Sequence, residues 1–169
     1  MEIRLFCTLN IKNVVTDVDG VLTDGKFLYN NIGKVMKRFG PHDSDGFKIL
    51  KSLGLNIQAI SADKRGFSIT KKRLTDMGVE LTLVSEVGRL DWIRSRYKLD
   101  ETMFIGDGYF DIDALQQCAI GVAPQNAPDL IRESANAVTS SRGSEGVIFE
   151  LALKFLEDRN KLKLNEKNF

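Results

Sequence analysis

Two aspartates stand where an apolar run of the sequence ends. Residues 12–16 have the pattern of a buried strand, and Asp17 and Asp19 follow with Gly20 behind them. Side chains two positions apart in a strand point the same way, and a bend at the glycine lets both carboxylates converge on one small ligand. Two buried like charges need a cation or a proton to compensate them. The pair fits either a catalytic site or an Asp-rich turn that caps the next element, and its place after a strand favours the site.

A second apolar run, residues 103–105, leads into acidic residues in the same way. Asp107 and Asp111 lie four positions apart, where a strand is expected to turn into a helix. Asp111 could cap that helix, and a capping carboxylate can still face a metal. Because two strands would deliver carboxylates to one edge of a sheet, we expect a site with few oxygen ligands that suits Mg²⁺.

A hydroxyl ends a third apolar run. Ser61 follows residues 56–60 and could donate to a phosphate oxygen, together with the backbone amides after it. A serine in this position is more often a helix cap, so Ser61 alone predicts no function.

Short apolar runs alternate with helical patterns along the chain, which is typical of an α/β protein with a parallel sheet. The expected strands are 12–16, 56–60, 81–84, 103–105 and 120–122, and the expected helices are 45–53, 66–77, 88–97, 111–118, 129–134 and 145–156. Residues 24–38 break the alternation with two short segments around an Asn/Gly turn. They predict a β-hairpin that projects from the carboxyl edge of the sheet, where such folds bind ligands.

Composition indicates one ordinary globular domain. The 169 residues are 43% hydrophobic and 28% charged, with a net charge of +1, so neither nucleic-acid nor membrane binding is expected. Cys7 and Cys118 lack metal-ligand spacing and have the character of small buried side chains. Residues 1–10 lack a signal-peptide core and no run of 18 apolar residues occurs, which predicts a cytoplasmic protein. The core is expected over about 11–156, with a polar tail over 158–169 that is frayed or docked on a neighbouring subunit.

The order Asp17-x-Asp19, Ser61 and Gly106-Asp107-x-x-x-Asp111 resembles the motifs of the haloacid dehalogenase superfamily. Within it, the chain is similar to the 3-deoxy-D-manno-octulosonate 8-phosphate phosphatase-like family, in segments 17–25, 37–39, 43–46, 127–128 and 142–147 and in the hairpin. Phosphatases of nine-carbon keto-sugar acids and C-terminal domains of some acylneuraminate cytidylyltransferases share these features. The resemblance implies a single domain over residues 1–169, with a three-layer Rossmann-like fold, a central parallel sheet and no large cap domain.

The resemblance also implies a magnesium-dependent phosphomonoesterase. Asp17 would attack phosphorus and form an aspartyl-phosphate, and Asp19 would protonate the leaving oxygen and then activate water. Mg²⁺ would be held by the Asp17 carboxylate, the Asp19 backbone carbonyl and the Asp107 carboxylate. Asp111 would orient a water ligand of the metal, and Ser61 would hold a phosphate oxygen.

The chain departs from that family around the pocket. Arg89 stands where the family has a lysine, so either its guanidinium clamps phosphate, or Lys64 takes that role, or Arg89 is a solvated residue at a helix start. Gly108 replaces a second acidic residue, and the segment 61–66 is unlike the family's usual one. These changes leave the nucleophile and the metal site intact, and they put the substrate in question.

The resemblance implies as substrate a phosphorylated acidic keto-sugar, such as 3-deoxy-D-manno-octulosonate 8-phosphate, or alternatively a nine-carbon acid or another small sugar phosphate. Lys34, Lys37 and Lys64 would suit a substrate carboxylate, or else line a solvated face. Family members without a cap are tetramers, and a hairpin packed on a partner fits that assembly. The alternative from another class is a catalytically weak oligomerisation or regulatory module, which Arg89 and Gly108 motivate.

Overall fold

A parallel sheet forms the centre of the molecule. The computed structural model describes residues 10–166, with side chains as far as residue 158, and the expectations for residues 1–9, for Cys7 and for residues 167–169 lie outside this range. The six strands run in the order β5-β4-β1-β6-β7-β8 and are all parallel. Their bounds are β1 Asn13–Asp17, β4 Asn56–Ser61, β5 Glu80–Leu83, β6 Thr102–Ile105, β7 Ile120–Ala123 and β8 Ala137–Val138.

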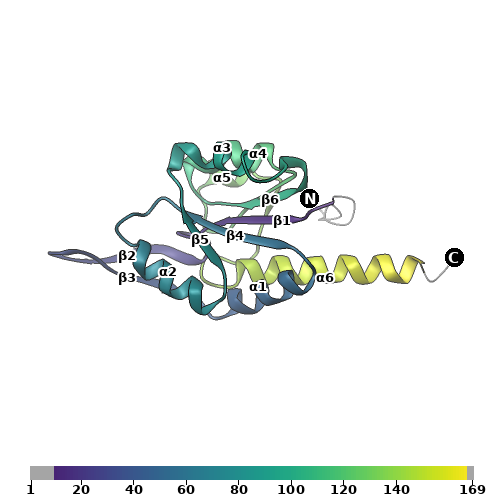
Figure 1. Ribbon diagram of the computed structural model, residues 1–169, viewed down its shortest axis with the longest axis horizontal. Helices are drawn as coiled ribbons and strands as arrows, with labels where there is room; N and C mark the ends of the chain where they lie inside the picture. Colours follow the sequence, from purple (N-terminus) through teal and green to yellow (C-terminus); the bar gives the residue numbers. More distant parts are fainter. Residues whose placement is uncertain (1–9, 167–169) are drawn as a thin grey trace.

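Alternate residues of the central strands feed two separate cores. Val14 and Met103 pack against one set of helices, whereas their chain neighbours Val15 and Phe104 pack against the other. Figure 1 shows the resulting three layers, with α1, α2 and α6 on one face and α3, α4 and α5 on the opposite face. The helices are α1 His42–Ser52, α2 Phe67–Asp76, α3 Arg89–Arg94, α4 Ile112–Gln117, α5 Asp129–Ser134 and α6 Val147–Glu166. The predicted three-layer α/β fold with a central parallel sheet is confirmed.

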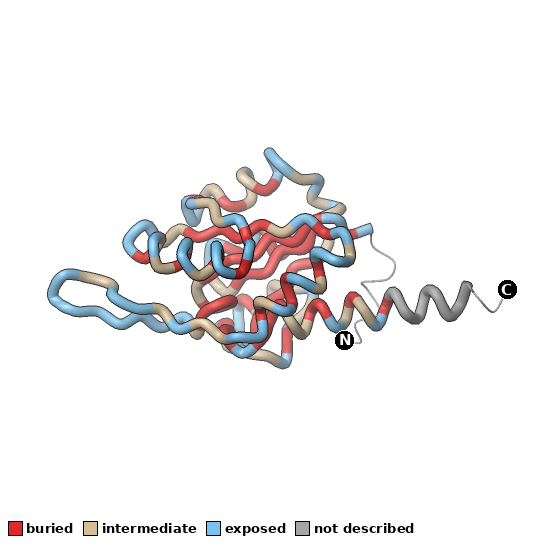
Figure 2. The backbone as a smooth tube through the Cα atoms, turned by 60° about the horizontal axis from the view of Figure 1, so that its bottom comes forward, coloured by how far each residue is buried: buried red, intermediate tan, exposed pale blue. Residues whose placement is uncertain are grey.

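A two-stranded antiparallel hairpin, β2 Thr23–Asn30 with β3 Gly33–Phe39, leaves the sheet directly after β1. The side chain of Asn30 closes its turn by accepting hydrogen bonds from the backbone N–H groups of Ile32 (2.9 Å) and Gly33 (3.1 Å). The hairpin projects from the body and is mostly exposed (Figure 2). It is the only insertion between β1 and α1, and no large cap domain occurs among residues 10–166.

The five expected strands and the hairpin are present, each within one residue at either end. The strand β8 was missed because two residues show no periodicity. The end predicted for the last helix, residue 156, is wrong, since α6 continues to Glu166. No glycine or proline occurs in residues 157–166 to stop it, so helix propensity carries the chain into the expected tail. The helix expected over 88–97 is shorter, with a 3₁₀ turn over Glu86–Gly88 before α3.

Cys118 is buried, as expected. No helix within residues 10–166 is long and apolar enough to span a membrane.

A buried carboxyl joins α1 to α6. Asp43 is 1% exposed, and its Oδ1 accepts a hydrogen bond from the backbone N–H of Ile148 (2.8 Å). Burial raises the pKa of Asp43 to about 6, against the opposing effect of backbone N–H groups at the start of α6. The folded state therefore keeps a proton that the unfolded chain releases near pH 4, so this group lowers stability as pH rises towards 6 and above.

We expect Asp43→Asn to raise the free energy of unfolding at pH 8, by about 1–3 kcal/mol, and to change it little near pH 4. The asparagine Oδ1 keeps the bond from Ile148 and removes the buried charge. Urea unfolding at the two pH values measures this, with Asp45→Asn, an exposed carboxylate on the same helix, as the control. A loss of stability at pH 8 would show instead that the charge on Asp43 stabilises the N-terminus of α6.

Candidate active site at the carboxyl edge of the sheet

The chain reverses its direction of travel across the sheet between β1 and β6. From β1 it passes to β4 and β5, and it then returns to β6 on the other side of β1. Open α/β sheets bind ligands at such a switch point, outside the carboxyl ends of the strands. Asp17 is the last residue of β1, and Asp107 follows β6 by two residues, so both predicted motifs reach this point.

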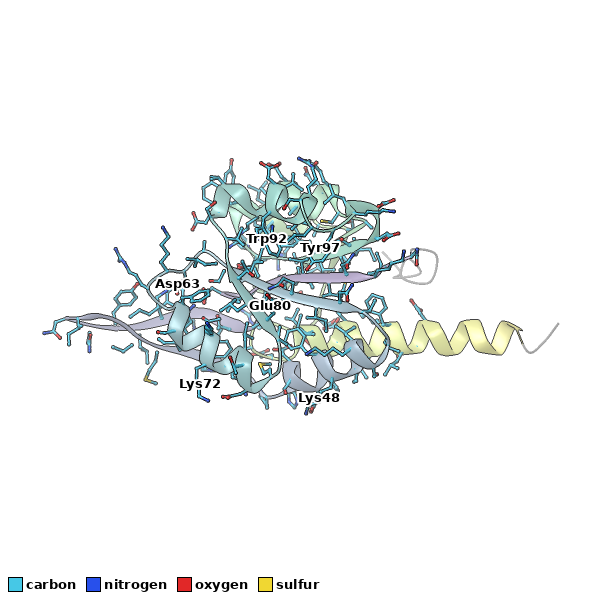
Figure 3. The ribbon with its side chains drawn as sticks, viewed as in Figure 1. Lys48, Asp63, Lys72, Glu80, Trp92 and Tyr97 are labelled. Carbon is cyan, nitrogen blue, oxygen red and sulfur yellow. The ribbon has the colours of Figure 1, made fainter. Side chains whose placement is uncertain are left out.

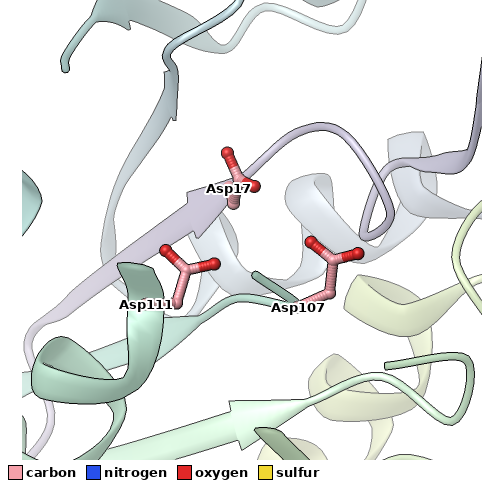
Figure 4. A group of neighbouring side chains, drawn as sticks. All are labelled: Asp17, Asp107 and Asp111. Carbon is pink, nitrogen blue, oxygen red and sulfur yellow. The ribbon is translucent and has the colours of Figure 1, made fainter. Parts of the chain in front are cut away.

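Three carboxylates meet there. Oxygen atoms of Asp17, Asp107 and Asp111 all lie within 4.8 Å of one another, and Figure 4 shows the three groups turned towards a common space. Asp111 is fully buried, and its Oδ2 accepts a hydrogen bond from the backbone N–H of Gly108 (2.9 Å). Gly106 permits this approach, because a Cβ there would lie 2.5 Å from Asp111 Oδ2.

The charges of this cluster are only partly compensated. Burial raises the pKa of Asp17 well above its ordinary value, and the neighbouring Asp111 and Asp107 raise it further, against the lowering effect of Arg89. Burial together with the charge of Asp111 raises the pKa of Asp107 to about 7. The carboxylates bind protons strongly because Arg89 supplies too little positive charge to balance them. Since carboxylate oxygens are hard ligands, the cluster fits a divalent cation such as Mg²⁺.

Arg89 lies against this cluster. Its Nη1 donates to Asp111 Oδ1, and its Nη2 lies 3.1 Å from Asp17 Oδ1. The side chain is 9% exposed, so the alternative that Arg89 is a solvated residue is wrong. Burial alone would lower the pKa of Arg89, but the charges of Asp17 and Asp111 raise it. Its Nε is buried without a hydrogen-bond partner among the described residues. Each Nη nitrogen carries a second N–H, so Arg89 keeps donors for a ligand in the pocket that it lines.

A pocket of about 500 Å³ opens at this site, with Asp17, Asp19 and Arg89 among its lining residues. Ser61, at the end of β4, lines it, and its Oγ accepts a hydrogen bond from the Asp63 backbone N–H (3.1 Å), which leaves the hydroxyl hydrogen free to donate. The loop after β4 brings Lys64 to the wall, and the hairpin contributes Lys34. The walls also carry the aromatic residues Phe27, Tyr29 and Phe110, for which the sequence offered no signal.

Asp63 links that loop to the hairpin. Figure 3 shows it at the sheet end that faces the hairpin. Its carboxylate accepts hydrogen bonds from Lys34 and from the backbone N–H of Gly66 (3.0 Å), and it lies 2.8 Å from the ammonium of Lys37. Burial alone would raise the pKa of Asp63, but the two lysines outweigh it and lower that pKa to about 2. The ammonium of Lys34 also lies 3.4 Å from the centre of the Phe27 ring.

Asn126 holds the turn after β1 in place. Its side-chain amide donates to the carbonyl oxygen of Gly20 (2.9 Å), and its Oδ1 accepts from the backbone N–H of Gly143. Asn126 was not predicted from the sequence, because a polar residue in a loop far from the motifs carries no local pattern.

Gly20 is the residue of that turn that space constrains most. Its φ is +89°, and a Cβ would lie 1.8 Å from Asp107 Oδ2. We expect Gly20→Ala to displace Asp107, so that added Mg²⁺ no longer raises the melting temperature and activity falls about 100-fold. Gly54→Ala is the matched control, because Gly54 has a φ of +82° but nothing within 4 Å of its Cβ position. Gly54→Ala should lose stability and keep the response to Mg²⁺. An equal loss of that response in both variants would show that contact between the new Cβ and Asp107 is not the cause.

Comparison with known proteins places this site in a family. A family of haloacid dehalogenase-like hydrolases matches residues 93–151. The chain is 31% identical over 157 residues to the 3-deoxy-D-manno-octulosonate 8-phosphate phosphatase of Haemophilus influenzae. The match covers 90% of this chain and 86% of that protein. The cobalt-bound structure of the Haemophilus influenzae enzyme superimposes with a TM-score of 0.79 at 30% identity, over 90% of this chain and 91% of that one.

The fold recurs in a more distant relative. The Moraxella catarrhalis enzyme, solved in complex with magnesium, phosphate and KDO, has a TM-score of 0.83 at 22% identity over 99% of both chains. The strand order and the aspartates at its switch point define a haloacid dehalogenase-like hydrolase. Within that class, the chain belongs to the 3-deoxy-D-manno-octulosonate 8-phosphate phosphatase family, and it is a phosphatase.

Proposed function

We propose that this protein is a magnesium-dependent phosphomonoesterase of a phosphorylated acidic keto-sugar, such as 3-deoxy-D-manno-octulosonate 8-phosphate, and that it acts through an aspartyl-phosphate. The observation that carries this proposal is the buried Asp17, which lines the pocket beside Arg89 and meets the carboxylates of Asp107 and Asp111. The names of the relatives support the substrate, and the cobalt-bound relative supports a divalent metal.

In the first step a carboxylate oxygen of Asp17 attacks phosphorus, and the bond from phosphorus to the sugar oxygen breaks. Asp19 lies two residues beyond Asp17, on the turn after β1, and lines the pocket, so it gives its proton to the departing oxygen. Asp19 then takes a proton from water, whose oxygen attacks phosphorus and releases inorganic phosphate and free Asp17. Ser61 and the guanidinium of Arg89, which both line the pocket, hold phosphate oxygens during both steps.

The metal ligands would be the carboxylates of Asp17 and Asp107 and the backbone carbonyl of Asp19. Asp111 lies next to these ligands and accepts hydrogen bonds from the backbone N–H of Gly108 and from Arg89, so it helps to fix the positions of the cluster. When bound, Mg²⁺ supplies positive charge that offsets the repulsion between the phosphate and Asp17.

The upper pocket supports an acidic sugar as the leaving group. Aromatic faces of Phe27, Tyr29 and Phe110 suit the C–H face of a sugar ring, and Lys34 and Lys64 supply positive charge for a carboxylate. Of these two lysines, Lys64 is exposed on the loop after β4, whereas Lys34 is already paired with Asp63. Lys64 is therefore the stronger candidate for direct contact with a substrate carboxylate.

We also propose a homotetramer in which the hairpin packs on a neighbouring subunit. The hairpin exposes large apolar side chains, namely Phe27, Leu28, Tyr29, Ile32, Val35 and Met36. An isolated hairpin is only marginally stable in water, so contact with a partner would stabilise it. Analytical ultracentrifugation tests the assembly, and a monomer at micromolar concentration would refute it.

A panel of substrates tests the proposed function. Phosphate release with Mg²⁺ is measured for 3-deoxy-D-manno-octulosonate 8-phosphate, a nine-carbon keto-sugar acid 9-phosphate, glucose 6-phosphate and 4-nitrophenyl phosphate. We expect the highest kcat/KM for the eight-carbon acid. Preference for the nine-carbon acid or for the neutral sugar would overturn the substrate, and no turnover of any compound with Mg²⁺ bound would favour the regulatory module.

A further inference from the structure

A buried lysine of the hairpin contacts the candidate active site without lining its pocket. Lys37 comes from β3, and its side chain is 0% exposed. Its ammonium lies 2.8 Å from the carboxylate of Asp19, 2.8 Å from Asp63 Oδ2 and 2.9 Å from Thr70 Oγ1 on α2. These three partners can occupy its three N–H donors. Lys37 is not among the residues that line the pocket, so it has no donor or surface left for the substrate.

The surrounding chain leaves room for this lysine. A Cβ at Gly66 would lie 2.6 Å from Lys37 Cε and 2.3 Å from Asp63 Oδ2. The φ of Gly66 is −100°, which other residues adopt readily, so space rather than backbone conformation requires the glycine. Thr70, which accepts from Lys37, is fully buried. The hairpin, the loop after β4 and α2 thus all meet at one ammonium group.

Asp19 depends on this lysine for its position. It lies beyond the end of β1, on the turn that contains Gly20, and its side chain is 19% exposed. Among residues 10–158, Lys37 is the only side chain that donates a hydrogen bond to its carboxylate. Without that contact the carboxylate would be free to rotate towards solvent, away from the leaving group.

We infer that Lys37 is a positioning residue, which holds the Asp19 carboxylate at the leaving oxygen and so couples the hairpin to proton transfer. This inference rests on the proposed function, in which Asp19 protonates the departing sugar oxygen. A sugar alkoxide needs that proton in order to leave, whereas 4-nitrophenolate leaves well without it. Loss of Lys37 therefore affects substrates according to their leaving groups.

The test compares kcat/KM, which reports the steps through leaving-group departure, for a sugar phosphate that the wild type hydrolyses and for 4-nitrophenyl phosphate. For Lys37→Met we expect a loss of about 10- to 100-fold with the sugar phosphate and less than about 3-fold with the aryl ester. Asp19→Asn should show the same selectivity, and Lys37→Met should cost nothing further in that background. Lys26→Met, an exposed lysine of the same hairpin, is the control and should keep both activities.

Equal losses with the two substrates, or losses that add to those of Asp19→Asn, would overturn the inference and leave Lys37 with a purely structural role. If Lys37→Met fails to fold, Asp63→Asn loosens the same ammonium without removing it and should give a smaller loss with the same selectivity. Failure of the proposed function looks different, because the wild type would then lack Mg²⁺-dependent turnover or Asp17→Asn would keep it.

Discussion

Asp17→Asn is expected to lower kcat for phosphate release by at least about 10⁴-fold, down to the background rate. The amide oxygen has no negative charge with which to attack phosphorus, and the amide is a poor ligand for Mg²⁺. Phosphate release from 4-nitrophenyl phosphate measures this effect, because that substrate needs little from the sugar pocket. Asp113→Asn, which removes an exposed carboxylate from α4, is the matched control and should keep full activity.

Loss of folding is not expected to explain that result. Asp17 is 4% exposed, and burial makes its charged form unfavourable, so its pKa is raised even with Arg89 beside it. An asparagine of the same shape removes this cost in the metal-free protein, while Arg89 keeps Asp111 as its partner. We therefore expect the melting temperature of metal-free Asp17→Asn to equal or exceed that of the wild type. A variant that keeps more than about a tenth of the activity would exclude Asp17 as the nucleophile.

The parts of the site that sequence analysis predicted are those fixed by a single strand. Asp17 and Asp107 were found because each follows an apolar run, and parallel strands end at the same edge of a sheet. The two runs also pair directly, with Thr16 opposite Ile105, which brings the carboxylates together.

The contacts that sequence analysis did not predict join segments far apart in the chain. Lys37 meets Asp63 and Thr70 only because the hairpin folds back over the loop and α2. Asn126 clamps Gly20 across more than a hundred residues of sequence. No local pattern encodes such pairs: a lysine in an exposed hairpin has the pattern of a solvated residue until its partners are known.

Removal of the metal is expected to change both activity and the pH dependence of stability. Chelation with EDTA should reduce phosphate release to about 1% or less of its value with Mg²⁺, because the phosphate then meets the Asp17 cluster without compensating charge. Activity with Mg²⁺ should also fall at acid pH, since Asp17 and Asp107 bind protons in place of the metal.

The stability of the metal-free protein should fall as pH rises from 5 to 8. The pKa of Asp107 is raised from 3.8 to about 7, so between these values the folded state binds more protons than the unfolded chain. The proton on Asp107 stabilises the folded state fully below about pH 4. This stabilisation, about 4 kcal/mol in all, is lost as pH rises through 7. Mg²⁺ binds the deprotonated cluster, so it should raise the melting temperature more at pH 8 than at pH 5. Asp107→Asn should reduce the pH dependence, to which Asp43 and Asp17 also contribute, and it should remove most of the response to Mg²⁺. A response to Mg²⁺ that is independent of pH would show that the cation binds elsewhere.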